Sequence, residues 1–81
     1  MQQASGADRI TAGLRQTLRL IAAGRARRVF LAADADERLQ ADVRSAAADA
    51  GVPVETCESM AALGRRCRIG VPCAAAAEAE K

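Results

Sequence analysis

Strand-like and helix-like segments alternate along almost the whole chain, and this alternation limits the folds that are open to it. The strand-like segments are short runs of apolar or alternating residues, and they lie at residues 8–12, 29–33 and 52–57. The helix-like segments carry apolar residues three and four positions apart, and they lie at residues 14–23, 36–50 and 60–66.

The alanine run that follows Cys73 is consistent with a strand or with a frayed helix. Alanine alone favours a helix, whereas packing against a sheet can override that preference. Counted as a strand, the run completes the order strand–helix–strand–helix–strand–helix–strand. This order predicts an α/β fold, a three-layer α/β/α sandwich around a small mixed four-stranded sheet.

Polar residues and glycines mark the ends of the expected helices. Asp34 or Asp36 is placed to accept N–H groups at the start of the second helix, and Ser59 does so for the third. Gly24 and Gly51 end the first two helices. The two aspartates are also conceivable Mg²⁺ ligands, but helix capping suits their spacing better.

Composition excludes several classes of function. The 81 residues suffice for one domain with a thin core, because 21 of the apolar residues are alanine. The chain has no histidine, so the usual general base near neutral pH and the commonest metal ligand are missing. There is no long apolar stretch and no signal-peptide pattern. We therefore expect a cytoplasmic protein that is not an enzyme, needs no cofactor or metal and does not enter a membrane.

The three cysteines, Cys57, Cys67 and Cys73, form no C-x-x-C pair, and their odd number does not suit a disulfide framework. We interpret them as small buried apolar residues. A thiol-based redox function is an alternative hypothesis that they leave open.

Charge is distributed unevenly along the chain. Residues 1–28 hold six arginines and one aspartate, residues 29–64 hold seven acidic residues and two arginines, and residues 65–81 are again basic. If the fold brings the two ends together, a single basic surface forms that suits a polyanion. Arginine accounts for 11 of the 12 basic residues. Its fork of donors suits phosphate, although a compositional bias explains the preference equally well.

One candidate binding segment is the helix start at residues 13–19. Gly13 permits close approach of another backbone, and the helix N-terminus offers N–H groups to an anion. Arg15 and Gln16 lie in the first turn and Arg19 one turn further, and these side-chain types contact purine edges and phosphates. The alternative is an ordinary solvated helix face.

A second candidate is the loop of Ile69, Gly70, Val71 and Pro72, whose apolar side chains suit stacking against unpaired bases. The alternative is a turn that plugs the core. The arginines at 25, 27 and 28 are phosphate contacts or a solvated lead into a strand.

Four stretches occur in the order and spacing of one known family: GLRQTLR at 13–19, AADAD at 32–36, ESMAALG at 58–64 and RIGVPCA at 68–74. The chain resembles the kink-turn RNA-binding ribosomal proteins of the L7Ae and L30e type, above all their small bacterial members. The resemblance covers residues 9 to about 77. It implies an α/β/α sandwich that binds a sharply bent RNA helix with sheared G·A pairs.

The resemblance also implies roles for individual residues. Gly13 would give close approach, Arg15 and Gln16 would contact guanine edges, and Arg19 would contact phosphate or base. The loop of Ile69, Gly70, Val71 and Pro72 would cover the unpaired bases at the bend, and Thr17 belongs to the same contact segment as Gly13.

Some residues depart from the family pattern. Arg15 stands where many members have Asn or Lys, and Ala33 replaces a residue that is usually charged. Arg68 occupies a position that is commonly Gly, which bears on the backbone of the loop. The C-terminal alanines lack the large apolar side chains of a typical last strand, so we expect them to pack weakly.

These observations predict one RNA-binding domain over residues 1–81, with frayed ends at 1–8 and 78–81. The expected partner is a structured RNA, a kink-turn in ribosomal RNA or a riboswitch, bound by a monomer without catalysis. The alternative function is a protein-interaction or ribosome-assembly module that uses the same fold without specific RNA binding.

Overall fold

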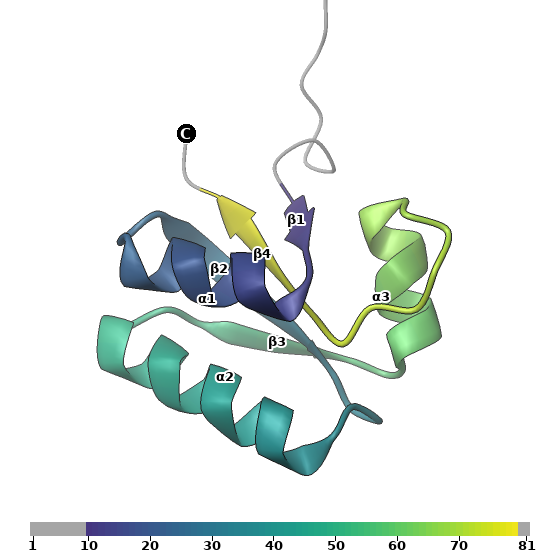
Figure 1. Ribbon diagram of the computed structural model, residues 1–81, viewed down its shortest axis with the longest axis horizontal. Coiled ribbons are helices and arrows are strands. Elements are labelled where there is room, and N and C mark those ends of the chain that lie inside the picture. The colour runs from purple at the N-terminus through teal and green to yellow at the C-terminus, as the bar shows by residue number, and fades with distance from the viewer. Residues whose placement is uncertain (1–9, 80–81) are drawn as a thin grey trace, which may run out of the picture.

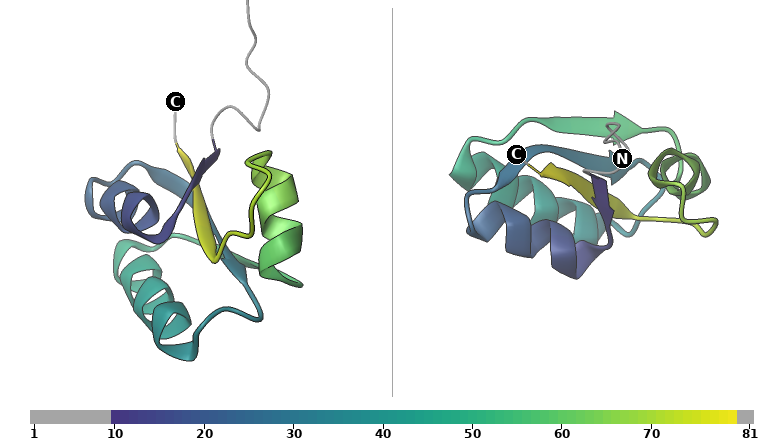
Figure 2. Two further views of the ribbon diagram at one scale, coloured as in Figure 1. Left: turned by 45° about the vertical axis from the view of Figure 1, so that its right-hand side comes forward. Right: turned by 90° about the horizontal axis from the view of Figure 1, so that it is seen from above.

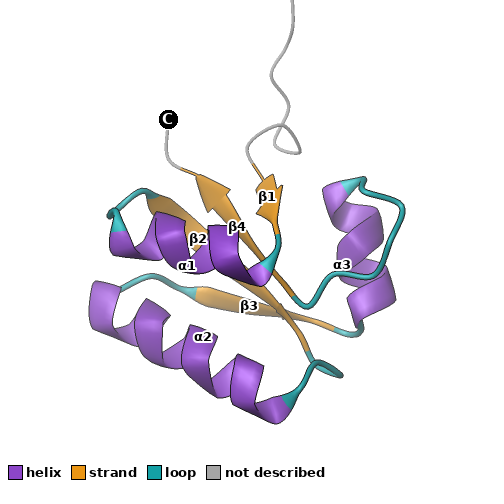
Figure 3. Cartoon of the chain, in the orientation of Figure 1, coloured by secondary structure: helices purple, strands orange, loops and turns teal. Residues whose placement is uncertain are grey.

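The computed structural model describes residues 10–79, which form seven elements in the predicted order (Figure 1). The elements are β1 (Ile10–Ala12), α1 (Leu14–Ala22), β2 (Ala26–Ala32), α2 (Glu37–Ala50), β3 (Val54–Cys57), α3 (Met60–Cys67) and β4 (Ala75–Ala79). The alternation of strands and helices is therefore confirmed, and the C-terminal alanine run is a strand (Figure 3).

The four strands form one mixed sheet in the order β1-β4-β2-β3. Strands β2 and β3 are parallel, whereas β4 pairs antiparallel with both β1 and β2. Helices α1 and α2 cover one face of the sheet and α3 lies on the other (Figure 2). The predicted three-layer α/β/α sandwich with a mixed four-stranded sheet is confirmed.

The core consists of two layers, one on each face of the sheet. Val29 and Leu31 of β2 face α1 and α2, where they pack with Ile21 and Val43. Phe30, the chain's one aromatic residue, points to the opposite face and packs against Leu63 of α3. Side chains therefore alternate between the two layers along β2, as the pleat of a strand requires.

Strand β4 lies inside the sheet although its side chains are small. Ala75, Ala76 and Ala77 are fully buried, because β4 is flanked by β1 and β2 and its two faces meet the two helix layers. The expectation that this run packs weakly is not supported by such complete burial. Glu78 and Ala79 belong to β4, so the prediction that they fray is wrong; residues 1–8 and 80–81 lie outside the described part of the chain.

The ends of the helices follow local signals closely. Asp36 caps α2 by accepting the N–H groups of Arg38 at 2.8 Å and Leu39 at 3.4 Å. Gly51 ends that helix in the left-handed conformation, and the Ser59 hydroxyl caps α3. Strand β2 starts at Ala26, three residues before the predicted start, because β4 pairs with its basic first residues.

No helix among residues 10–79 combines the length and the apolar character needed to cross a bilayer.

Candidate functional site

Gly13, where the first predicted binding segment begins, lies beside the start of β4, and the second predicted binding segment comes just before that strand in the chain. Ala12, the last residue of β1, pairs with Ala76 near the start of β4. The Gly13 N–H donates to the Ala75 carbonyl at 2.9 Å, and the Cys73 thiol donates to the same oxygen at 3.0 Å. One backbone oxygen therefore accepts hydrogen bonds from the start of α1 and from the segment that leads into β4. The start of α1 lies next to this segment in the ribbon (Figure 1).

Helix α1 begins without a side-chain cap. Gly13 has φ 112° and ψ 145°, a conformation that L-residues rarely adopt, and no side-chain cap hydrogen bond is formed. The first turn carries no acidic residue. Its N–H groups and the positive end of the helix dipole are thus available to an anion.

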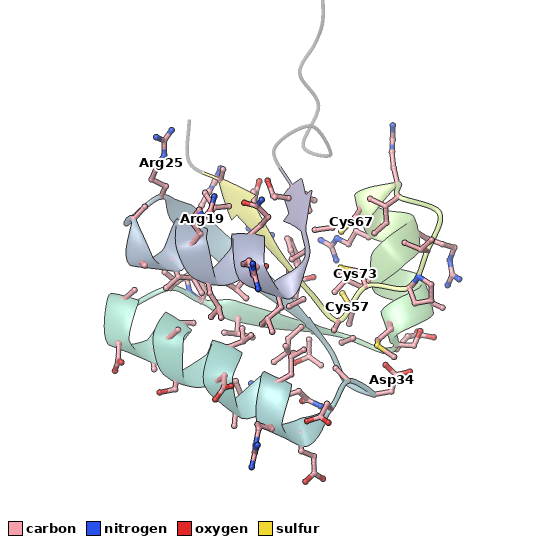
Figure 4. The ribbon with its side chains drawn as sticks, in the orientation of Figure 1. Arg19, Arg25, Asp34, Cys57, Cys67 and Cys73 are labelled. Carbon is pink, nitrogen blue, oxygen red and sulfur yellow. The ribbon has the colours of Figure 1, made fainter. Side chains whose placement is uncertain are left out.

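The side chains of Arg15, Gln16 and Arg19 are all exposed on α1. Ion pairs among residues 10–79 involve Arg28 and Arg66 only, so Arg15 and Arg19 hold their charge free of any described carboxylate. Figure 4 shows Arg19 projecting from α1. The structure therefore exposes Arg15 and Gln16 at the uncapped start of α1, and Arg19 in its last turn.

Thr17 lies differently from its neighbours. Its side chain is fully buried, and its hydroxyl donates to the Gly13 carbonyl at 2.8 Å. The buried hydroxyl offers no surface atom to a ligand. It supports the backbone conformation of Gly13 instead.

The loop at residues 69–72 presents apolar side chains to solvent. Ile69 is 42% exposed and Val71 58% exposed, and they are the exposed large apolar side chains found among residues 10–79. A turn that plugs the core would bury these side chains. The loop is therefore an exposed apolar surface rather than a plug of the core.

Hydrogen bonds and close packing fix this loop. The Ile69 N–H donates to the Gly64 carbonyl at 3.2 Å, and the Cys73 N–H donates to the Met60 carbonyl at 2.9 Å. Gly64 packs directly against the Val71 carbonyl, with no room for a Cβ. The loop therefore follows α3 as a rigid segment.

Arg68, the residue that replaces the usual Gly, ends α3 with φ 60° and ψ 37°. Its left-handed conformation is the one that glycine adopts readily, so the arginine does not alter the course of the backbone. Sequence reasoning did not assign it to the site. The sequence did contain a relevant feature, since an arginine stands where glycine is common, directly before the apolar loop.

Two other arginines, Arg28 and Arg66, have structural roles. Arg28 contacts Glu55 at 3.5 Å and Glu78 at 3.8 Å. Arg66 contacts Glu55 at 2.8 Å, and its guanidinium lies 4.5 Å from the centre of the Phe30 ring. The hydrogen bond to Glu55 raises the pKa of Arg66.

Arg25 precedes β2 and lies at the end of the sheet away from Gly13 (Figure 4). Arg28 and Arg66 are paired with carboxylates, whereas Arg15, Arg19 and Arg25 are exposed and form no ion pair among residues 10–79, so only part of the basic charge of the two terminal segments is free.

The acidic turn between β2 and α2 is engaged in capping. The Asp34 carboxylate accepts the Met60 N–H at 2.8 Å and so caps α3 rather than α2. Gln40 donates to the carbonyls of Ala33 and Ala35 and fixes the turn from the other side. Both aspartates thus have backbone partners, which favours capping over a metal-binding role.

Together, these features define a small α/β/α protein whose candidate site combines an open, basic helix start with a rigid apolar loop. The whole chain, residues 1–81, matches the family described as "Ribosomal protein L7Ae/L30e/S12e/Gadd45 family". The chain belongs to this family, as its four sequence stretches indicated.

Individual relatives agree with the family assignment. The chain is 42% identical over 71 residues to the RNA-binding protein GK0100 of Geobacillus kaustophilus, covering 88% of this chain and 87% of that protein. It is equally similar, 42% over 71 residues with the same coverage, to the RNA-binding protein YbxF of Geobacillus stearothermophilus.

A solved structure shows the same fold. The 15.5kD RNA binding protein of Giardia lamblia superimposes with a TM-score of 0.85 at 34% identity. The match covers 94% of this chain but 66% of the Giardia protein, so this chain spans slightly less than two thirds of that longer relative.

Proposed function

We propose that this chain binds RNA, that its target is a kink-turn with sheared G·A pairs, and that it catalyses no reaction. The observation that carries the proposal is the junction at the Ala75 carbonyl, which accepts hydrogen bonds from the open helix start at Gly13 and from Cys73, the residue that directly follows the loop of exposed apolar residues. Two relatives above 40% identity and a solved structural neighbour are named as RNA-binding proteins, which supports the first part.

Each half of the site supplies a different kind of contact. The uncapped N–H groups after Gly13 suit a phosphate, while Arg15 and Gln16 suit the edges of guanines in G·A pairs. Arg19 contacts phosphate one turn further along the helix. Ile69 and Val71 cover unpaired bases, and Gly70 and Pro72 shape the loop that carries them.

Thr17 acts indirectly in this proposal. Its buried hydroxyl holds the Gly13 carbonyl, so it positions the helix start rather than touching RNA.

The mechanism is selection of the bent RNA. A protein that contacts the kinked form better than the extended form shifts the population toward the kink by its difference in affinity. The protein acts as a cytoplasmic monomer, and its RNA is a structured element such as a ribosomal or riboswitch kink-turn.

A titration of the full chain against a fluorescent kink-turn RNA at about 0.15 M salt tests the proposal. The control RNA has Watson–Crick pairs in place of the G·A pairs. Tight binding to the first RNA and weak binding to the second is the expected result. Equal, weak binding to both would favour the alternative, a protein-interaction module of the same fold.

Two variants dissect the helix start. Gln16→Ala should cost about 1–3 kcal/mol on the kink-turn and little on plain duplex, as for a lost base contact. Arg19→Ala should weaken binding and flatten its salt dependence, as for a lost phosphate contact. Equal losses for Gln16→Ala on both RNAs, or an unchanged salt slope for Arg19→Ala, would contradict these roles.

A further inference from the structure

Arg68 retains a backbone conformation that is unfavourable for its side chain. Among residues 10–79 it is the one residue other than glycine with a positive φ. This left-handed conformation is unfavourable for an L-residue with a Cβ atom, whereas glycine adopts it without cost. Strain of this kind at an exposed position points to a task for the side chain.

Three arginines lie at the C-terminal end of α3, and they differ in their partners: Arg65 and Arg66 in the last turn and Arg68 at the C-cap. Arg66 is occupied by Glu55 and the Phe30 ring. Arg65 and Arg68 are exposed, and neither takes part in an ion pair within residues 10–79. These two guanidinium groups therefore remain available, whereas Arg66 has a structural role.

Arg65 and Arg68 belong to one turn of the chain, since the Arg68 N–H donates to the Arg65 carbonyl at 3.1 Å. Arg68 directly precedes the loop at residues 69–72, which doubles back along α3 (Figure 1). Arg65 lines a shallow pocket of about 200 Å³ together with Gly70, Val71 and Pro72. The two free cations thus flank the apolar loop.

We propose that Arg65 and Arg68 bind phosphate groups of the RNA strand that passes over this loop, and so extend the interface beyond the helix start at Gly13. The inference rests on the proposed RNA-binding function. Apolar side chains alone hold a base without fixing its backbone, whereas arginine forks bind the adjoining phosphates with charge and direction. The arginine at position 68 thus lowers the stability of the fold and in return provides a contact to the RNA.

Variants at position 68 separate charge from backbone strain. Arg68→Gly relieves the strain, so Tm should rise by about 4 °C, while kink-turn affinity should fall about tenfold at about 0.15 M salt. Its log–log salt slope should flatten by about 0.9 for one lost contact. Arg68→Asn removes the charge with a side chain that tolerates the left-handed region, and should lose the same affinity.

Arg68→Lys keeps the charge and should retain most of the affinity. Arg65→Ala should lower affinity and flatten the slope in the same way. Arg25→Ala is the matched control, an exposed arginine at the far end of the sheet that should leave the kink-turn affinity unchanged. Unchanged affinity and slope in Arg68→Gly and Arg68→Asn, with normal kink-turn binding by the wild type, would overturn the inference.

The same experiment distinguishes this failure from failure of the proposed function. Wild-type protein that binds kink-turn and control RNA equally would overturn kink-turn recognition. The phosphate contact would survive that result if Arg68→Asn still flattened the salt slope and Arg25→Ala did not. Wild-type protein that binds neither RNA would overturn both proposals.

Discussion

Replacing Gly64 with alanine should destabilise the protein, although helix propensity predicts the opposite. Gly64 lies inside α3, where alanine is favoured over glycine by about 1 kcal/mol. A Cβ at this position would collide with the Val71 carbonyl, and it would lie 2.9 Å from the Val71 carbonyl carbon and 3.3 Å from the Pro72 Cα. These are backbone atoms, so no side-chain rotation relieves the collision.

The magnitude follows from the two opposing terms. Overpacking of a fixed site costs about 1–3 kcal/mol, and a rigid backbone neighbour places Gly64→Ala at or above the upper end. After the gain in helix propensity, the free energy of unfolding should fall by about 2 kcal/mol. For a domain of this size, that lowers Tm by roughly 8–16 °C.

Thermal unfolding followed by circular dichroism measures the stability change. Ala61→Gly, an exposed substitution in the same helix, calibrates the propensity term alone and should cost about 1 kcal/mol. Kink-turn affinity of Gly64→Ala, measured well below its Tm, should also fall because Val71 and Pro72 must move. A Tm equal to or above that of the wild type would refute the packing argument, because the gain in helix propensity would then equal or exceed the cost of the collision.

Two further predictions concern the thiols and the helix caps. At pH 8, iodoacetamide should modify Cys57 before Cys67 and Cys73, which are only 7% and 5% exposed. The pKa of the Cys67 thiol is raised from 9.0 to about 11, mainly because the thiol is buried and to a smaller extent because Cys73 lies close to it. As the pH rises, the Cys67 thiol therefore loses its proton in the unfolded chain before it does so in the folded protein. The free energy of unfolding should fall between pH 9 and 11, and Cys67→Ala should remove this pH dependence. Equal labelling rates at all three thiols would contradict the burial. Asp36→Ala should cost about 1 kcal/mol by uncapping α2, and Asp34→Ala a similar amount by uncapping α3, whereas the exposed Asp42→Ala should have little effect on chemical denaturation. A stability loss for Asp42→Ala as large as for Asp36→Ala would show that charge, rather than capping, is responsible.

Local signals in the sequence were sufficient for the first six elements and for the caps that a residue provides to its own helix. Asp36, Gly51 and Ser59 act where their positions predicted, because a cap bonds within three or four residues of itself. The two segments of the candidate site were also predicted, since an apolar loop and a basic helix start are both visible as residue types.

Features that depend on distant partners were not predictable. Asp34 caps a helix that begins 26 residues later, and no local pattern distinguishes it from Asp36. Glu55 pairs with Arg28 and Arg66 because β2, β3 and α3 converge there, which removes both arginines from the supposed basic surface. Only the folded chain shows which charges are neutralised and which stay free.

Strand β4 shows the same limit for secondary structure. Alanine has the highest helix propensity, yet Ala75–Ala79 is a strand because both its backbone edges find partners in β1 and β2. Hydrogen bonding on both edges and complete burial outweigh a local preference of less than about 1 kcal/mol per residue. Tertiary pairing therefore decides the conformation of this run.

The alanines of β4 also determine the geometry of the candidate site. Gly13 and Cys73 are far apart in sequence, and they meet only because β4 runs antiparallel beside β1 and presents the Ala75 carbonyl to both. Ala75 is fully buried between the sheet's neighbours and the helix layer of α1 and α2, so a larger side chain there would push the strand or the helix aside. The distance between the helix start and the apolar loop therefore depends on a residue that has no functional side chain. The proposed binding of one bent RNA shape would require such a fixed spacing, and a backbone oxygen in an alanine strand contributes to it.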